Sequence, residues 1–332
     1  MIRIVKKYLK LIYDKITISQ TKKEIEKAIT ASGLLDDRKK LSVLKAIVQT
    51  KQLSIIDNEM SCEAICFSKD RVMQLHALLM SYYKYVKNPV KLTVLYTFSN
   101  ERHQATYDSL IKLFVGYNIC FVKEKDFKND LESLLNSIEA KKCFFMTDDA
   151  LFIDDVDLAD FIKYNPSEAI PCLTKGLDLT YCFTYDWQQA LPRFIYNSEV
   201  ALNQKCWNWG EVPETSPDWA YPLSLDATLF EKTEVEIIIK NTLYKAPNTL
   251  ESNMQFYLEL FNYRKGICFD KVKYVNVPCN LVQTEIPNKT TGEYDIEFLL
   301  EKWEQGYRIH FEEYYQQDCK VVQKSRYNFV KR

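Results

Sequence analysis

The feature that most constrains this chain is an alternation of two sequence patterns that begins near residue 62. Short continuous apolar runs alternate with longer stretches that carry apolar residues at helical spacing, in the order 63–68, 70–86, 92–96, 101–115, 119–122, 129–140 and 143–146. Continuous apolar strands are buried on both faces, and strands that alternate with helices pair in parallel because each crossover helix returns the chain to the same edge. The sequence therefore predicts an α/β fold with a mostly parallel sheet flanked by helices.

Composition and charge narrow the classes of protein. The chain has 332 residues, 47% of them hydrophobic and 14% aromatic, which is enough to build a core. Lys and Arg number 44 and Asp and Glu 45, so no excess positive charge is present to hold nucleic acid. No apolar run approaches the ~18 residues that cross a bilayer, and no cleavable signal follows Met1. The ten cysteines are scattered without CxxC spacing, which predicts reduced thiols in a cytoplasmic protein.

The first 60 residues differ from the rest. Residues 1–23 contain seven basic residues and one acidic residue, with apolar residues at helical spacing, and stretches 21–32 and 37–50 continue in the same style. One interpretation is a basic helix on an anionic membrane, at the inner face; the others are a helix packed on the main domain or a contact with a second subunit. We expect a helical extension over 1–60, a main domain over 61–290, and a helical segment over 291–332 that packs back on this domain or on a second subunit.

Two adjacent carboxylates, Asp148 and Asp149, close the fourth apolar run. Such a pair at the end of a buried strand is unfavourable unless a cation or hydrogen-bond donors compensate it. Mg²⁺ and Mn²⁺ prefer carboxylate and phosphate oxygens, and one or two protein carboxylates often suffice. No GxGxxG or GxxxxGK motif follows any of the runs, so another device must hold any phosphates. The pair predicts a metal and diphosphate site; the alternative is a solvated acidic turn that caps the next helix.

The run Thr147-Asp148-Asp149, placed after three strand–helix units, resembles the metal and sugar-nucleotide motif of glycosyltransferases with the GT-A fold, family 2 in particular. The resemblance covers residues 62–285 and implies a Rossmann-type sheet with Mn²⁺ or Mg²⁺ bound mainly through Asp149. Asp148 would be a second ligand, or would face the ribose or a metal-bound water. Ala150 departs from the third acidic residue that is common in such motifs.

The loop after the first run adds four candidates for donor binding: Ser68, Lys69, Asp70 and Arg71. The family resemblance places base recognition here. Asp70 would accept a hydrogen bond from a nucleobase N–H, and Arg71 would reach the diphosphate. The alternative is that Asp70 caps the following helix.

Aromatic residues gather in 207–210 and 218–230, which have no helical period and resemble a tryptophan-rich loop and strand of bacterial polysaccharide glycosyltransferases. Ala227 stands where the resemblance leads us to expect glycine. Sugars place their C–H faces on aromatic rings, so these segments predict an acceptor cleft. The alternative is that the rings belong to the core. The candidates are Trp207, Trp209, Trp219 and Tyr221.

Residues 246–252 indicate the start of a helix, with Asn248 or Thr249 as its cap and Glu251 in the first turn. A carboxylate there is favoured by the helix dipole whatever its role. By the family resemblance Glu251 is the base that removes the acceptor proton, with Asp226 as the rival.

The predicted function is transfer of a sugar from a nucleotide-sugar donor to a glycan or glycolipid acceptor, assisted by a metal and with inversion favoured, in bacterial surface polysaccharide synthesis. A sugar nucleotidyltransferase and a non-catalytic carbohydrate-binding protein of the same fold are the alternatives.

Overall fold

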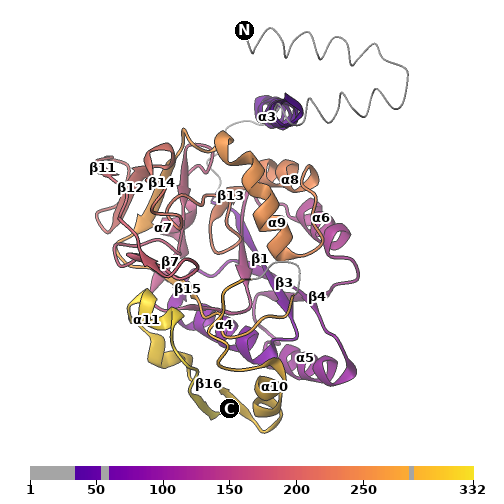
Figure 1. Ribbon diagram of the computed structural model, residues 1–332. Helices are drawn as coiled ribbons and strands as arrows, with labels where there is room; N and C mark the ends of the chain where they lie inside the picture. The colour runs from indigo at the N-terminus through magenta and orange to yellow at the C-terminus, as the bar shows by residue number, and fades with distance from the viewer. Residues whose placement is uncertain (1–33, 54–59, 284–287) are drawn as a thin grey trace, which may run out of the picture. The chain divides into compact units, whose positions relative to one another are not determined.

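The computed structural model describes residues 34–53, 60–283 and 288–332 (Figure 1). The chain divides into two compact units, residues 1–57 and 58–332. The described part of the first unit is helix α3 (Leu34–Leu53), which includes the predicted helical stretch 37–50. The basic segment 1–23 and the stretch 21–32 lie outside the described residues.

The second unit is built on a five-stranded sheet with the order β13–β5–β1–β3–β4. Four of the strands are parallel, and the fifth, β13, runs antiparallel to β5 at one edge. Each predicted apolar run forms one parallel strand. The bounds are β1 (Cys62–Lys69), β3 (Lys91–Thr97), β4 (Ile119–Lys123), β5 (Lys142–Thr147) and β13 (Leu229–Glu231). The predicted α/β class with a mostly parallel sheet is confirmed.

The order of the parallel strands determines where a ligand can enter. From β1 the chain moves outward through β3 to β4, and then crosses back to place β5 on the other side of β1. This is the order of one half of a Rossmann-type sheet, and its crevice opens at the carboxyl ends of the two strands where the direction reverses. In this chain those ends are Lys69 of β1 and Thr147 of β5.

Helices cover both faces of the sheet (Figure 1). On one side α4 packs against α5 and α10, and on the other α6 packs against α8. The first turn of α5 is capped by Asn100, whose side chain accepts a hydrogen bond from the N–H of His103 at 3.0 Å. The bounds are α4 (Val72–Tyr85), α5 (Glu101–Leu113), α6 (Phe127–Ser137), α7 (Leu158–Ile162), α8 (Lys232–Lys240), α9 (Pro247–Met254) and α10 (Ile296–Glu304).

A second, mixed sheet has the order β11–β12–β14–β8. Trp207 of β12 lies across Gly266 of β14, and a Cβ at position 266 would stand 2.2 Å from the indole ring, so this position requires glycine. Its strands are β8 (Ala169–Pro171), β11 (Phe194–Ile195), β12 (Gln204–Asn208) and β14 (Lys265–Phe269). The remaining short strands of the central part form pairs: β2 (Val86–Lys87) with β7 (Val156–Asp157), β6 (Ala150–Phe152) with β15 (Tyr274–Asn276), and β9 (Tyr181–Cys182) with β10 (Trp187–Gln188).

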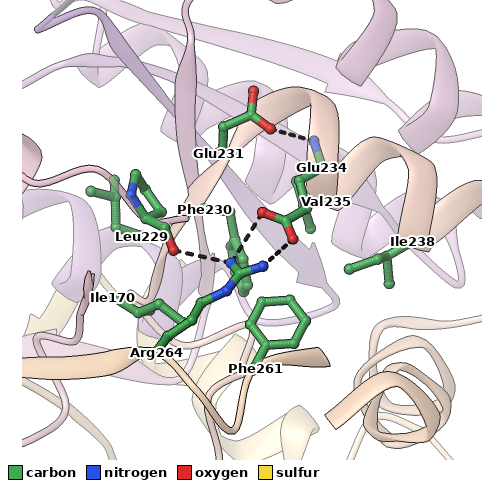
Figure 2. Close-up of a pocket in the computed structure, with 10 residues that line it drawn as sticks. Ile170, Leu229, Phe230, Glu231, Glu234, Val235, Ile238, Phe261 and Arg264 are labelled. Atoms are coloured by element: carbon green, nitrogen blue, oxygen red, sulfur yellow. Dashed lines mark hydrogen bonds and ion pairs between the residues drawn. The ribbon is translucent and has the colours of Figure 1, made fainter. Parts of the chain in front are cut away.

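A buried ion pair joins helix α8 to the residue that precedes β14 of the second sheet (Figure 2). Arg264, which immediately precedes β14, binds both carboxylate oxygens of Glu234 in α8, and one of these contacts spans 3.0 Å. The same guanidinium donates to the carbonyl of Pro166 at 3.0 Å and lies 4.1 Å from the ring centre of Phe261. Because both charged groups are almost fully buried, each depends on the other for compensation.

The C-terminal segment contains α10, the short helix α11 (Cys319–Gln323), and an antiparallel pair of the strands β16 (Tyr307–Ile309) and β17 (Phe329–Lys331). It contacts the main domain through Trp303, whose indole N–H donates to Ser109 Oγ at 3.1 Å, and through Arg102, which binds Glu297 at 2.8 Å. The segment is thus helical only in part, because the antiparallel pair of β16 and β17 belongs to it.

Three short 3₁₀ helices complete the secondary structure of the described residues: Trp209–Glu211, Gln255–Leu260 and Phe311–Tyr314. All ten cysteines are free thiols, and nine of them are buried. Among the described helices, none combines the length and the apolar character that a membrane span requires.

Candidate active site

A cavity of about 920 Å³ opens at the carboxyl ends of β1, β3 and β5. The last residue of each of these strands lines it: Lys69, Thr97 and Thr147. The cavity therefore occupies the position at which α/β sheets of this order bind ligands.

The acid pair lies at this edge. Asp148 and Asp149 form the turn between β5 and β6, and both line the cavity. The chain continues directly into β6, which pairs antiparallel with β15, and Ala150 is a buried residue of that strand. Since a strand and not a helix follows the pair, the alternative that one of the two aspartates caps the next helix is wrong.

Arg71 provides the positive charge that the acid pair needs. Its Nη1 donates to Asp148 Oδ1 at 3.1 Å and to Asp149 Oδ2 at 3.0 Å. On its other side Asn280 accepts from the guanidinium through its side-chain oxygen at 2.9 Å and its carbonyl at 2.5 Å. Arg71 also lines the cavity, so its predicted contact with a diphosphate stays a prediction.

The two carboxylates differ in environment. Burial raises the pKa of Asp148 to about 6, and the charge of Asp149 raises it as well, although the Arg71 guanidinium acts in the opposite direction. Asp148 also accepts from the N–H of Lys69 at 3.1 Å, so each of its oxygens has a protein donor. The side chain of Asp149 is 15% exposed. Asp149 is therefore the carboxylate of the pair that a ligand in the cavity can reach.

The loop after β1 divides into residues that line the cavity and one that does not. Ser68 and Lys69 line it, and Ser68 Oγ is 2.7 Å from the hydroxyl of Tyr107. Asp70 does not line it; its carboxylate accepts from the N–H and the hydroxyl of Ser99 at 2.7 and 2.5 Å. Helix α4 begins after Arg71 without a side-chain cap. Both interpretations of Asp70, a nucleobase acceptor and a helix cap, were wrong, because Ser99 uses its carboxylate to join the ends of β1 and β3.

Asp226 and Glu251 line the same cavity. Asp226 Oδ1 accepts from Thr147 Oγ1 at 2.8 Å and from Asn276 Nδ2 at 3.1 Å, which connects it to the strand that carries the acid pair. Glu251 Oε1 accepts from Ser224 Oγ and from the N–H of Leu225, both at 2.8 Å. The structure thus places both rival bases on the ligand cavity.

The pKa values of these two carboxyls favour Glu251 over Asp226 as the proton acceptor. Burial raises the pKa of Glu251 to about 7, and the charge of Asp226 raises it as well, although the hydrogen bonds from Leu225 and Ser224 lower it. Burial also raises the pKa of Asp226, while its bonds to Asn276 and Thr147 act in the opposite direction. A carboxyl with a pKa near the working pH is suited to accept and release a proton.

Helix α9 presents Glu251 from its first turns, but its start differs from the prediction. The N-cap is Ala246, and neither Asn248 nor Thr249 caps the helix. Thr249 lies at the third helical position, from which its Oγ1 accepts from the N–H groups of Lys245 and Ala246 at 3.0 and 3.1 Å. The threonine thus satisfies backbone donors from inside the helix.

Three of the four predicted acceptor residues belong to the core. Trp207, Trp209 and Trp219 are at most 4% exposed and do not line the cavity. They pack edge to face, with ring centres 5.0 Å apart for Trp207 and Trp209 and 5.1 Å for Trp207 and Trp219. The acceptor prediction was wrong for these three, because their rings pack on one another in the core. Of the four candidates, Tyr221 alone lines the cavity.

The strand predicted within 218–230 is shorter than expected. It comprises β13 at Leu229–Glu231, and the residues from Tyr221 to Thr228 form an extended loop along the cavity. Ala227 adopts φ +46°, a left-handed conformation that favours glycine, which agrees with the glycine expected there.

Sequence reasoning missed Lys175. This residue lines the cavity and is 5% exposed, and its ammonium donates to the hydroxyl of the neighbouring Thr174 at 3.1 Å. Its positive charge lowers the pKa of both Asp226 and Glu251, although burial outweighs it. The loop around it has no hydrophobic period, so no pattern in the sequence marks it.

The cavity could hold a divalent cation through one reachable carboxylate, that of Asp149. Among the described residues no group of three or more His, Cys, Asp and Glu side chains is placed to hold a metal ion. Asp149 offers one reachable carboxylate, and Mg²⁺ commonly binds one or two carboxylates together with substrate phosphates.

Known proteins were compared with this chain. No protein-family model matches it. The bifunctional glycosyltransferase pgtA of Dictyostelium discoideum is 28% identical over 190 residues, which cover 53% of this chain and 24% of that protein. The chain therefore spans about a quarter of the length of this curated relative.

Solved structures of glycosyltransferases also match, loosely. Residues 1–349 of S. aureus TarS give a TM-score of 0.39 at 12% identity, covering 64% of this chain and 59% of that one. The apo structure of the bifunctional glycosyltransferase WbbM gives 0.32 at 10% identity, covering 61% and 38%. The sequence similarity to pgtA confirms the predicted resemblance to glycosyltransferases, and the strand order confirms the predicted mostly parallel sheet.

Proposed function

We propose that this chain transfers a sugar from a nucleotide-sugar donor to a hydroxyl of a glycan or glycolipid acceptor. One observation carries the proposal: a single cavity at the switch point of the sheet is lined by the acid pair and also by Glu251, a carboxyl with a pKa of about 7. The first group suits a nucleoside diphosphate and the second suits an attacking hydroxyl. The sequence similarity to a glycosyltransferase supports the same class.

For the donor, we place the nucleoside against the ends of β1 and β3, where Ser68, Lys69 and Phe98 line the cavity. The diphosphate then lies next to Asp149 and within the field of Arg71. Mn²⁺ or Mg²⁺ held by Asp149, with Asp148 behind it, would neutralise charge on the leaving diphosphate. The buried ammonium of Lys175 supplies a further positive charge on the same cavity.

For the reaction, Glu251 accepts the proton of the acceptor hydroxyl as that oxygen bonds to the anomeric carbon and the bond to the diphosphate breaks. Ser224 Oγ and the N–H of Leu225 hold the carboxylate in position, both through Oε1. Asp226 keeps the pKa of Glu251 high and is itself fixed by Thr147 and Asn276. A single displacement of this kind inverts the configuration at the anomeric carbon.

Three further expectations stay predictions. They are the cytoplasmic location, a contact of residues 1–23 with a membrane or a second subunit, and a role in bacterial surface polysaccharide synthesis.

The test begins with a thermal-shift panel of UDP-, GDP-, CMP- and dTDP-sugars with and without Mn²⁺. A ligand at about 100 times its dissociation constant stabilises the folded state by about 2.7 kcal/mol, which is measurable. With the donor identified in this way, we expect Asp149→Asn to lower release of nucleoside diphosphate by about 10²-fold or more. The matched control is Asp108→Asn, an exposed aspartate in α5 outside the cavity.

Three outcomes would contradict parts of the proposal. Turnover of Asp149→Asn at the wild-type rate removes the metal role. Release of pyrophosphate from a nucleoside triphosphate and a sugar phosphate identifies a nucleotidyltransferase. Binding of a sugar nucleotide without turnover, in the presence of Mn²⁺ and a panel of acceptors, identifies a non-catalytic carbohydrate-binding protein.

A further inference from the structure

Two exposed aromatic rings stack on each other beside the cavity. Tyr185 and Trp187 lie at the tip of the β9–β10 hairpin, with ring centres 4.8 Å apart and an angle of 13° between the ring planes. Tyr185 is 57% exposed and Trp187 45%, whereas the other four tryptophans of the chain are at most 4% exposed. The two rings do not contribute to the core, because they remain exposed to water. Exposed apolar surface of this kind is typical of a binding site.

The hairpin holds the pair in one orientation. Asp186, which lies between the two residues in the sequence, adopts φ +59°, and its N–H donates to the carbonyl of Cys182 at 3.0 Å to close the turn. The Asp186 carboxylate accepts from the hydroxyl of Tyr181 and lies 3.6 Å from Lys289 Nζ and 3.7 Å from Lys324 Nζ. A surface held by contacts with several separate segments loses little entropy when it binds a ligand.

The pair is continuous with the cavity. Tyr185 lines the cavity, together with Phe183 and Thr184 of the same hairpin, and Trp187 stands next to Tyr185 outside it. Asp218 also lines the cavity and accepts from the side chain of Gln189, which follows β10, at 2.7 Å. A chain-like ligand that leaves the cavity past Tyr185 therefore meets Trp187 next.

The chemistry of the surface favours a carbohydrate. The C–H face of a pyranose ring stacks on aromatic rings, while its hydroxyls need polar partners at the ring edge. Asp186 and Lys289 provide charged groups beside the pair, and their side chains are 64% and 35% exposed. A stable protein interface needs about 800 Å² on each partner, whereas two rings bordered by charges offer the area of one or two sugar units.

We propose that Tyr185 and Trp187 form a glycan subsite that binds a sugar unit of the acceptor away from its reacting hydroxyl. The acceptor is then an oligosaccharide or a longer glycan, not a single sugar. This inference rests on the proposed function, since it places the acceptor in the cavity, but the binding itself can be measured without turnover.

Trp187 supplies the readout. Acrylamide quenches exposed indole rings, and Trp187 is the exposed tryptophan among the five, so quenching of intrinsic fluorescence reports mainly on it. The probes are maltotriose, cellotriose, chitotriose, mannotriose and galactotriose, each compared with its methyl monosaccharide. We expect at least one trisaccharide to lower the quenching constant about twofold and to bind about tenfold more tightly than its monosaccharide. Equal binding of trisaccharide and monosaccharide throughout the panel would overturn the subsite.

Variants separate this surface from the rest of the protein. Tyr185→Ala and Trp187→Ala should each weaken binding of that trisaccharide about tenfold, measured by calorimetry, while Trp187→Phe, which keeps a ring, should retain most of it. The control is Tyr196→Ala, since Tyr196 is 93% exposed and does not line the cavity. A loss as large in Tyr196→Ala as in Trp187→Ala would overturn the proposal.

Hydrolysis of the sugar nucleotide by water separates a failure of the glycan subsite from a failure of the proposed function. If the wild type binds the trisaccharide through Trp187 but turns over no donor, the proposed function fails and the subsite stands. If the wild type turns over the donor while no trisaccharide protects Trp187, the subsite fails and the function stands.

Discussion

At the scale of single residues, the protonation of Glu251 depends on a balance between its neighbours. The hydroxyl of Ser224 and the N–H of Leu225 favour its charged form, whereas burial and the negative charge of Asp226 favour the neutral form and outweigh them. The carboxyl is therefore about half ionised near neutral pH. This is a suitable state for a group that must take a proton in each turnover.

The pH dependence of turnover should report this balance. We expect kcat/KM for sugar transfer to rise through pH 7, because only ionised Glu251 can accept the proton, and the rise should follow one ionisation. Glu251→Gln should lower kcat by about 10²–10⁴-fold and remove the rise. Asp226→Asn should move it to lower pH, because the neighbouring negative charge is gone.

The control is Glu214→Gln, an exposed glutamate away from the cavity, which should leave the profile unchanged. A rise through pH 7 that persists in Glu251→Gln would assign the proton acceptor to another group.

At the scale of elements, the position of α8 against the second sheet depends on the ion pair between Glu234 and Arg264 (Figure 2). Both side chains are almost fully buried, so loss of one leaves the other as an uncompensated charge in an apolar environment. Neither residue lines the large cavity. The pair thus supports the architecture around the site without touching its ligands.

Breaking this pair should lower stability and spare the chemistry. We expect Arg264→Met and Glu234→Gln each to lower the free energy of unfolding by about 3–5 kcal/mol, measured by urea denaturation. Turnover per folded molecule should stay at the wild-type value. The double variant should recover part of the loss, since it leaves no buried charge without a partner.

A matched control is the exposed pair of Lys87 and Asp157, in which the lysine side chain is 76% exposed and the ions are 3.0 Å apart. Lys87→Met should change the free energy of unfolding by less than about 1 kcal/mol. An equally small effect of Arg264→Met would show that the buried pair does not hold α8.

At the scale of the whole molecule, burial of the Glu251 carboxyl in the cavity makes the free energy of unfolding depend on pH. Glu251 has a pKa near its ordinary value of 4.5 in the unfolded chain and of about 7 in the folded one. Below pH 4.5 the group is neutral in both states, and its full contribution to stability is present. As the pH rises through 7 the folded state must ionise a buried carboxyl, and that contribution is lost.

We therefore expect Glu251→Gln to be more stable than the wild type at pH 8, by about 3 kcal/mol, and the difference to shrink to about 1 kcal/mol at pH 5. Gln keeps the side-chain oxygen that accepts from Ser224 and Leu225, so the hydrogen bonds survive the change. Urea denaturation from pH 5 to pH 8 measures the difference. A constant difference across this range would contradict the raised pKa.

The order of strands and helices from residue 62 to Thr147 follows from the sequence by itself. Apolar periodicity is a local property, and each predicted run became a strand or helix within a few residues of the expected bounds. The same holds for the acid pair at the end of β5, because a parallel sheet with crossover helices brings the carboxyl ends of its strands to one edge. The glycine expected at position 227 came instead from the resemblance to known glycosyltransferases, and the structure places Ala227 in the left-handed region.

The tertiary structure decided which side chains meet. Arg71 binds Asn280, 209 residues along the chain, as well as the acid pair, and Ser99 takes the carboxylate of Asp70. The second sheet buries Trp207, while the aromatic pair at the β9–β10 tip stays in water. A ring or a carboxylate has the same local pattern in a core and in a binding site. Only the packing of distant segments determines whether water or protein surrounds it. This packing buries Glu251, which raises its pKa, and leaves Trp187 exposed.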